Sequence, residues 1–324
     1  MKRPRFLPDN MTLLLLAVVL TASFLPCSGQ AAVGFNHLTS AMIALLFFMH
    51  GAKLSRAAVL AGATHWRLHL TVLLFTFAVF PLLGLLLKPV LLWLVSPELY
   101  LGILFLCVLP STVQSSIAFT SVARGNVPAA VCSASASNLI GIFLTPLLVS
   151  LLLASSAASH SSFDAILKIV TQLLLPFVAG QIARPWIAAW IGRHREVLKM
   201  VDQSSILLVV YVAFSEAVVQ GLWHQVPATM LLSLLAISAV MLAIIMSLTM
   251  FASRRFGFSK EDEITVVFCG SKKSLASGVP MAKVLFASHA VGMVLLPLML
   301  FHQLQLMVCA VMAQRYAARE NKTH

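Results

Sequence analysis

Charged side chains are scarce in this sequence: 10% of its 324 residues are Asp, Glu, Lys or Arg, whereas 60% are hydrophobic. A soluble globular domain carries about 25% charged residues, so this chain has too little polar surface to face water on all sides. A membrane-spanning helix needs about 20 apolar residues. The length therefore leaves room for roughly ten such helices joined by short connections.

The signatures of several other protein classes are also absent. None of the five cysteines shows CxxC spacing, which argues against a metal site and against a disulfide framework. No phosphate-binding loop, GxSxG, HExxH or dinucleotide-binding fingerprint occurs in the context it needs. The sequence shows no group of water-exposed acid, base and nucleophile. We therefore expect neither an enzyme nor an ATP-driven pump, and no cofactor beyond a coupling ion, either a proton or sodium.

Basic residues outnumber acidic ones, 22 to 10. They are not gathered with aromatic residues, as a nucleic-acid-binding face would require, but lie in short connections between apolar runs. With the N-terminus inside, most of them fall on the cytoplasmic side, and the positive-inside rule then places both termini in the cytoplasm. We expect a multi-pass protein of a bacterial inner membrane whose partners are the bilayer and a small molecule, with no nucleic acid.

Ten apolar runs are predicted to span the membrane, at residues 10–27, 36–52, 68–95, 99–123, 127–154, 164–183, 201–221, 227–252, 262–287 and 290–316. The first has a basic lead-in like that of a signal peptide, but the many runs that follow favour an uncleaved helix. The basic stretch 183–199, which contains two tryptophans, is predicted to lie at the membrane interface and to join two halves of five helices each.

The two halves share landmarks at a constant offset. Thr12 and Thr171 begin corresponding runs, and Ser115 and Ser274 lie in polar interruptions, both at an offset of 159 residues. Five is an odd number of helices, so a second copy must insert upside down, as in the inverted repeats of secondary transporters. We expect an all-α membrane protein of two inverted five-helix repeats, residues 1–162 and 163–324.

The predicted fourth helix carries polar residues in the middle of an apolar run. Pro110 removes a backbone donor and is followed closely by Gln114, Ser115 and Ser116. The freed groups need protein, water or ligand as partners, because lipid offers none. We predict a functional break; the alternative is a Pro-kinked helix whose hydroxyls bond back to its own carbonyls.

The predicted ninth helix contains the string CGSKKSLASG, which places Ser271, Lys272, Lys273 and Ser274 where lipid is expected. An unpaired lysine in a membrane costs about 3 kcal/mol or more. Adjacent residues of a regular helix point about 100° apart, so either the helix is unwound here or one lysine lies in an aqueous cavity. A cytoplasmic loop that reaches as far as Lys273 is the other alternative.

Further polar groups complete the candidate site. Ser133 and Ser137 lie four residues apart on one helical face, beside Asn138, and either line the site or serve as small residues in helix packing. Glu216, within the seventh run, is assigned as a possible counter-charge for Lys272 or Lys273, with a place near the periplasmic surface as the alternative.

These motifs resemble the bile acid:sodium symporter superfamily over nearly the whole chain. The resemblance rests on LFFMHGAKLS, FAVFPLLG, the polar fourth run followed by ARGNV, and TPLL. The string CGSKKSLASGVPMAKVLF is similar to the branch that includes solute carrier family 10 member 7 and its bacterial and fungal relatives. The resemblance implies ten helices in which helices four and nine are broken and cross. It also implies a panel domain of helices 1, 2, 6 and 7 that rocks against a core domain of helices 3–5 and 8–10.

The same resemblance shows where cation ligands are missing. The sodium-coupled members have a glutamate at the position of Phe268, a glutamine at that of Lys272 and another glutamine at that of Thr76. Hydroxyl ligands remain at Ser115, at Ser116 and at the serines of the fifth run. A lysine cation in place of a ligand repels sodium, so we expect the Lys272 ammonium to occupy the space of a sodium ion.

The function that follows is secondary transport of a small organic anion or amphipath by alternating access, without sodium coupling. Half-helix N-termini beside a lysine attract anions. Two alternatives stay open: a sodium-dependent symporter of bile-acid-like anions, and a non-transporting membrane regulator of calcium homeostasis. The polar breaks favour a transporter, because a regulator has no need of them.

Overall fold

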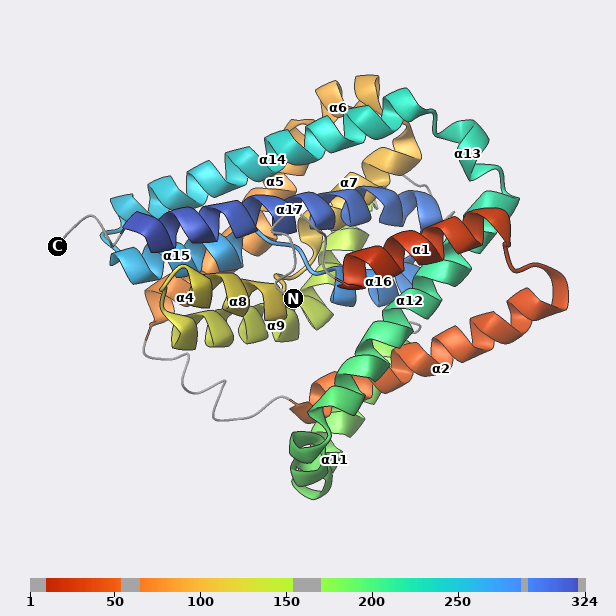
Figure 1. Ribbon diagram of the computed structural model, residues 1–324, viewed down its shortest axis with the longest axis horizontal. Helices are drawn as coiled ribbons and strands as arrows, with labels where there is room; N and C mark the ends of the chain where they lie inside the picture. Colours follow the sequence, from red (N-terminus) through yellow and green to blue (C-terminus); the bar gives the residue numbers. More distant parts are fainter. Residues whose placement is uncertain (1–9, 54–64, 154–169, 287–290, 320–324) are drawn as a thin grey trace, which may run out of the picture. The chain divides into compact units, whose positions relative to one another are not determined.

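The computed structural model describes residues 10–53, 65–153, 170–286 and 291–319, and every regular element in these ranges is a helix (Figure 1). Seven described spans are long and apolar enough to cross a bilayer, and each covers one of the predicted apolar runs. The other three runs hold the shorter helix α1 and two helix pairs that are interrupted in the middle. The predicted boundary between repeats, at residues 162 and 163, lies outside the described residues.

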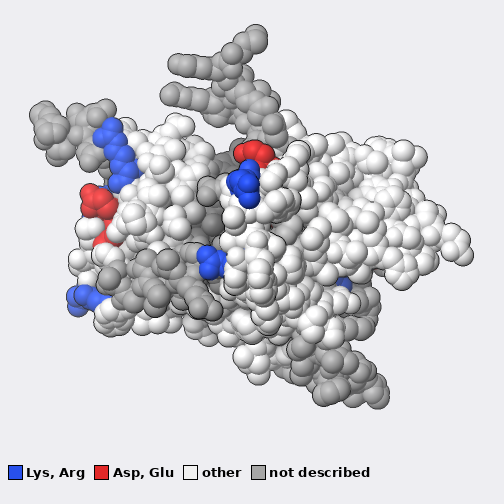
Figure 2. Space-filling view, turned by 90° about the horizontal axis from the view of Figure 1, so that it is seen from below, with Lys and Arg blue, Asp and Glu red and all other residues white. Residues whose placement is uncertain are grey.

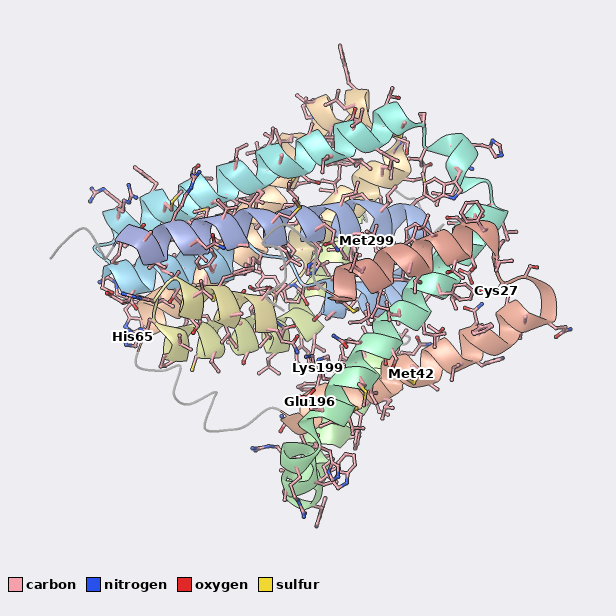
Figure 3. All side chains as sticks on the ribbon, viewed as in Figure 1. Cys27, Met42, His65, Glu196, Lys199 and Met299 are labelled. Atoms are coloured by element: carbon pink, nitrogen blue, oxygen red, sulfur yellow. The ribbon has the colours of Figure 1, made fainter. Side chains whose placement is uncertain are left out.

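The chain divides into two compact units, and the first comprises residues up to Lys53, residues 170–226 and residues 279–293. Cys27 lies at the turn between its first two helices (Figure 3). The helices of this unit are α1 (Asn10–Phe24), α2 (Gly29–Lys53), the π-helical turn η2 (Val170–Leu174), α11 (Leu175–Arg193), α12 (Arg195–Val219) and the short α13 (Leu222–Gln225).

Within this unit α2 and α11 pack backbone to backbone at two glycines. A Cβ atom on Gly51 would collide with the carbonyl oxygen of Phe177, and one on Gly180 would collide with the carbonyl oxygen of Phe48. Small residues permit this close approach between helices in a membrane. The α2–α11 pair therefore depends on having no side chain at either position.

The helices α11 and α12 are separated by His194 alone. The predicted interfacial stretch 183–199 is therefore not a separate connection, because α11 runs on to Arg193 and α12 begins at Arg195. Its place at the membrane interface stays a prediction. Hydropathy falls in this stretch because it carries charged residues. Arg, Lys and Glu are nevertheless good helix formers, so the loss of hydropathy does not mark a helix end. Glu196 and Lys199 lie near the start of α12 (Figure 3).

The second unit holds the remaining described residues, 65–153, 227–278 and 294–319. α16 (Leu275–Leu285) begins in this unit and continues into the first, and α17 (Val291–Arg319) belongs to it from Val294 onward. Its other elements are α4 (Trp66–Leu74), the π-helical turn η1 (Phe75–Val79), α5 (Phe80–Leu86), α6 (Lys88–Leu94), α7 (Pro97–Val108), α8 (Gln114–Val122), α9 (Val127–Leu153), α14 (Ala228–Arg255) and α15 (Lys260–Gly270).

The π-helical turn η1 releases one carbonyl group from the third predicted helix. The Phe80 N–H bonds to the Phe75 oxygen, five residues back, whereas in a regular α-helix it would bond to the Thr76 oxygen. Pro81 follows and has no N–H to offer. The Thr76 oxygen is thus left for a partner from elsewhere in the chain.

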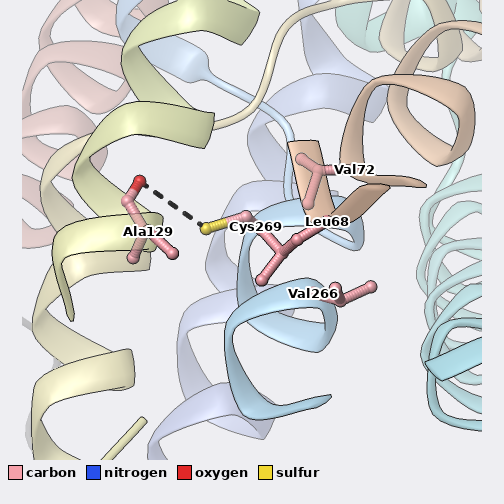
Figure 4. Close-up of a cluster of buried hydrophobic side chains, with 6 residues drawn as sticks. Leu68, Val72, Ala129, Val266 and Cys269 are labelled. Atoms are coloured by element: carbon pink, nitrogen blue, oxygen red, sulfur yellow. Dashed lines mark hydrogen bonds between the residues drawn. The ribbon is translucent and has the colours of Figure 1, made fainter. Parts of the chain in front are cut away.

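A cluster of buried apolar residues holds α15 against α4 and α9 (Figure 4). Leu68 and Val72 come from α4, Ala129 from α9, and Val266 and Cys269 from α15. Full burial of a Val or Leu side chain is worth about 1.5–3 kcal/mol. This packing fixes the end of α15, where the polar stretch of the ninth run begins.

Charged side chains are sparse on the face of the molecule shown in Figure 2.

Candidate functional site

Two helix pairs of the second unit are interrupted where the sequence predicts breaks. α7 ends at Val108 and α8 begins at Gln114, and Leu109 between them has an extended backbone. α15 ends at Gly270 and α16 begins at Leu275. Both lysines of the ninth run therefore lie in unwound chain and both are fully buried. This confirms unwinding and makes the cytoplasmic-loop alternative wrong.

The two breaks lie against one another and exchange hydrogen bonds. The Ser111 hydroxyl donates to the Cys269 oxygen at 2.6 Å, and the Ser274 N–H donates to the Pro110 oxygen at 2.8 Å. The Ser116 hydroxyl donates to the oxygen of Phe268 at 3.0 Å. These hydroxyls bond to the other broken helix and not back to their own, so the simple Pro-kinked helix is ruled out.

Five successive carbonyls at the first break, from Cys107 to Ser111, have donors from other parts of the second unit. Thr145 donates to Val108 at 2.8 Å and Asn138 donates to Ser111 at 2.6 Å. Lys273 serves the oxygens of Cys107 and Leu109, and the Ser274 N–H serves Pro110. Buried backbone groups need partners when they leave a helix. The start of the break is therefore held by hydrogen bonds at each of these carbonyls.

The Lys273 ammonium binds three backbone carbonyl oxygens. Its Nζ lies 2.7 Å from the Thr76 oxygen, 2.7 Å from that of Cys107 and 2.9 Å from that of Leu109. The Phe80 ring faces it, with Nζ 4.1 Å from the ring centroid. Three acceptors match the three donors of an ammonium group, whereas a neutral amine has two. Lys273 thus holds the first break and the η1 turn together as a bound cation would.

Gln305 of α17 holds the main chain of the second break at the same residue. Its Oε1 accepts from the Lys273 N–H at 2.9 Å, and its Nε2 donates to the Lys273 oxygen at 2.9 Å. One side-chain amide thereby replaces both hydrogen bonds that a helix would have supplied to this residue.

The Lys272 ammonium lies in a different setting, over aromatic rings. Its Nζ donates to the Ser115 oxygen at 2.9 Å and lies 4.1 Å from the ring centroid of Phe119 and 5.3 Å from that of Phe268. Cation–π contacts of this kind are worth about 2 kcal/mol or more when desolvated. The aromatic residue at position 268, where a carboxylate is expected from the resemblance, therefore contacts a side-chain cation.

The predicted polar residues of α9 support the first break. Ser137 accepts from the Ser111 N–H at 3.0 Å, and Asn138 bonds both to the Ser111 oxygen and, through Oδ1, to the Ser277 hydroxyl at 2.7 Å. Ser133 contacts something else: its hydroxyl lies 2.6 Å from Nδ1 of His69. Two of the three residues predicted here are thus brought to the breaks.

The remaining predicted residues differ in accessibility. Gln114 is exposed and Ser115 is half-buried, so both keep surface that a solute could reach. Ser271 is buried and its hydroxyl bonds to the Val267 oxygen at 2.6 Å. Ser274 caps the start of α16, where it accepts from the Ser277 N–H at 3.2 Å.

Glu216 does not pair with Lys272 or Lys273, so that prediction is wrong. Its carboxylate pairs with Lys283 at 2.8 Å and accepts a hydrogen bond from the Asn36 amide at 3.0 Å. All three belong to the first unit. The other two lysines are bound by carbonyl oxygens and rings, partners that a count of acidic residues cannot reveal.

Several residues of these networks escaped sequence reasoning. Gln305 and His69 are polar residues within apolar runs, a signal that could have singled them out. The role of Thr76 could be sought from Pro81, since a proline leaves carbonyls without donors in the preceding turn. Nothing in the sequence distinguishes the pairing of Lys283 with Glu216.

Comparison with known proteins agrees with this architecture. The profile of the SBF-like CPA transporter family matches residues 9–318. The chain is 68% identical to "Uncharacterized protein PA2026" of Pseudomonas aeruginosa, over 99% of this chain and 96% of that one. It is 58% identical to "Putative symporter YfeH" of Escherichia coli, over 95% and 92%. It is 29% identical to "Sodium/bile acid cotransporter 7" of Mus musculus, over 83% and 80%.

These matches confirm the resemblance found in the sequence, including the branch that its ninth run indicates. The family is one of transporters and not of enzymes, and the relatives from Escherichia coli and Mus musculus are named as a putative symporter and a cotransporter. The chain belongs to the SBF-like CPA transporter family and is a multi-pass membrane transporter.

Proposed function

We propose that this transporter is a secondary carrier of small organic anions that works without sodium. The observation that carries the proposal is the placement of two lysine ammonium groups, both fully buried, at the contacting breaks. A site that already contains fixed positive charge attracts anions and repels a metal cation.

The size of that repulsion supports sodium independence. At 4 Å from the Lys272 ammonium, a sodium ion would be repelled by about 4 kcal/mol at an effective dielectric constant of about 20. That energy corresponds to roughly a thousandfold loss of affinity. Phe268, whose ring contacts the same ammonium, offers no carboxylate to offset it.

The proposed architecture is the ten-helix fold of two inverted repeats, with crossing breaks near the bilayer midplane. The panel would be built from helices 1, 2, 6 and 7 and the core from helices 3–5 and 8–10. The first compact unit contains the described parts of the four panel helices, and it also takes in residues 279–293 of the ninth and tenth runs. Alternating access then arises as one unit rocks relative to the other. The positive-inside rule supports an inner-membrane location with both termini in the cytoplasm.

The solute would be recognised mainly through the positive electrostatic potential of the site and through the fit of its shape to the site. Lys273 has committed its three donors to carbonyl oxygens, so an anion would feel its charge without a direct bond. Gln114 and Ser115, at the start of α8, keep exposed surface. The N-terminal end of this helix adds a partial positive charge of about half a unit.

Uptake into proteoliposomes tests the proposal, with acetate, malate and cholate as probes. At least one of them should enter at the same rate under an inward sodium gradient and under an inward choline gradient. Uptake that sodium stimulates would overturn the proposal in favour of a sodium symporter. Absence of uptake for every probe, equal to protein-free vesicles, would overturn it in favour of a regulator.

A pair of variants sharpens this test. Phe268→Glu combined with Lys272→Gln exchanges the fixed cation for a carboxylate and an amide, the ligand types that the resemblance assigns to sodium. We expect uptake by this double variant to become sodium-dependent. Lys272→Gln alone is the matched control, because it removes the cation without supplying a carboxylate.

A further inference from the structure

An ion pair lies in the first unit, whose residues do not include the two breaks. Lys283 of α16 lies 2.8 Å from Oε2 of Glu216 of α12, and Asn36 of α2 donates to the other carboxylate oxygen at 3.0 Å. Three helical elements thus converge on one carboxylate. Both of its oxygens are bonded, one to a cation and one to a neutral amide.

This pair differs from the other two lysines of the ninth run in accessibility. Lys272 and Lys273 are 0% exposed, whereas the side chains of Lys283 and Glu216 are 16% and 30% exposed. A charge within a membrane-spanning region is costly in lipid. Surface that such a pair retains must therefore meet water or solute. Of the three lysines of the ninth run, Lys283 is thus the one that keeps exposed surface.

The partner of Lys283 is the carboxylate of Glu216, and a solute carboxylate can replace it. Carbonyl oxygens of the main chain cannot leave Lys273, but a carboxylate can be exchanged for another carboxylate. Loss of one partner from an ion pair away from bulk water is costly, because the other charge is left uncompensated. Glu216 can therefore release Lys283 only when its own charge is neutralised and another anion takes its place.

We propose that Glu216 and Lys283 form a proton-for-partner exchange site for a carboxylate solute. In the empty state the Glu216 carboxylate pairs with the Lys283 ammonium. In the loaded state Glu216 has taken a proton from water, and the solute carboxylate pairs with Lys283. The only covalent change is the O–H bond formed on Glu216, and it breaks again when the solute leaves. This inference rests on the proposed function, anion transport, and adds its coupling ion and a binding residue.

Charge balance is the physical advantage of this exchange. The empty site holds one positive and one negative charge, and the loaded site holds the same two charges plus a neutral acid. The site is thus neutral in both states, which avoids the cost of carrying net charge through a region of low dielectric. The Asn36 amide can donate to Glu216 in either form, so it keeps the side chain in place throughout.

Other titratable groups lie on α12 itself and on the elements packed against it. The described residues of α1 include none. Asp202, the nearest acidic residue on α12 itself, lies 14 positions away, or about 21 Å along the helix. Among the side chains that the structure describes, the others are His37 and His50 on α2, Arg184 and Arg193 on α11, His224 on α13, and Glu196 and Lys199 at the start of α12.

The test measures binding and proton uptake together on the purified full-length protein. Acetate, malate and cholate are added as potassium salts, thermal unfolding reports binding, and a pH indicator in weak buffer reports protons. We expect at least one carboxylate to raise the Tm and to bring one proton onto the protein for each anion bound. Apparent affinity should rise as pH falls, by up to about tenfold per pH unit.

Variants separate the two roles. Glu216→Gln should bind the same carboxylate without proton uptake and without dependence on pH. Lys283→Met combined with Glu216→Gln leaves no unpaired charge, so it should fold, and it should lose the Tm shift. The matched control is Glu196→Gln combined with Lys199→Met, which removes the same two charges from the exposed start of α12 and should behave as wild type.

The outcomes distinguish this inference from the proposed function. A carboxylate that stabilises the Lys283→Met/Glu216→Gln variant as well as wild type, or that binds wild type without a proton, overturns the exchange site and leaves anion transport standing. If none of the three carboxylates binds wild type or enters proteoliposomes, the proposed function and this inference fall together.

Discussion

Replacement of Lys273 by Met should destabilise the protein more than the same replacement of its neighbour. In Lys273→Met three buried carbonyl oxygens, those of Thr76, Cys107 and Leu109, lose their donor. Each buried acceptor left without a partner costs about 1–3 kcal/mol, or about 3–9 kcal/mol in total before relaxation. The Met side chain carries no charge, so the variant avoids the cost of burying an ammonium group, which offsets several kcal/mol of this loss. We therefore expect a net loss of up to about 5 kcal/mol in the free energy of unfolding.

Lys272→Met is the matched control, since it removes the same charge one residue away. Its ammonium donates to a single carbonyl, that of Ser115, and a charged hydrogen bond is worth about 1.5–3 kcal/mol. Each lysine also lies 4.1 Å from the centroid of an aromatic ring, so a cation–π contact is lost in both variants. Thermal unfolding in detergent, followed by tryptophan fluorescence, measures both variants. Equal Tm values for the two variants, or a Lys273→Met protein as stable as wild type, would refute the role of Lys273 as an internal cation.

Two further predictions concern the supports of the site. Asn138→Asp should lower stability by about 2 kcal/mol or more, because a carboxylate would face the Ser111 oxygen in place of an N–H donor; Ser150→Ala on the same helix, whose hydroxyl bonds only to Pro146, should change the Tm little in the same unfolding assay. Gly180→Ala should impair folding, since the added Cβ meets the backbone oxygen of Phe48. Gly192→Ala, with open space around it, should express and elute from gel filtration as wild type, and equal behaviour of the two glycine variants would contradict the close packing of α2 and α11.

The sequence predicted the breaks well because their causes are visible in side chains. Pro110 lacks a donor, and two adjacent lysines cannot be accommodated by a regular apolar helix, so both interruptions could be placed before any coordinates were known. The lengths of α11 and α12 were harder to predict, because hydropathy falls with charge while helix propensity does not.

The partners of the lysines could not be predicted, for a different reason. Lys273 binds main-chain oxygens, and every residue has one, so no residue type marks the site. The Thr76 oxygen is available only because η1 is a π-helical turn. The residue types around Thr76 do not predict a π-helical turn. Because the sequence does not reveal these carbonyl acceptors, it suggests Glu216 as a partner for Lys272 or Lys273, whereas Glu216 pairs with Lys283.

The double hydrogen bond from Gln305 to the Lys273 peptide has a consequence for motion. Irregular backbone in a membrane protein is commonly its most mobile part. Here the non-helical segments of both breaks are instead hydrogen-bonded to neighbouring helices. The amide protons of Lys273, Ser274 and Ser111 all have partners outside their own segment. Their exchange with solvent deuterium should be as slow as that of a helix interior. The second unit would then move as one rigid body, and its two non-helical breaks would be among its least mobile segments.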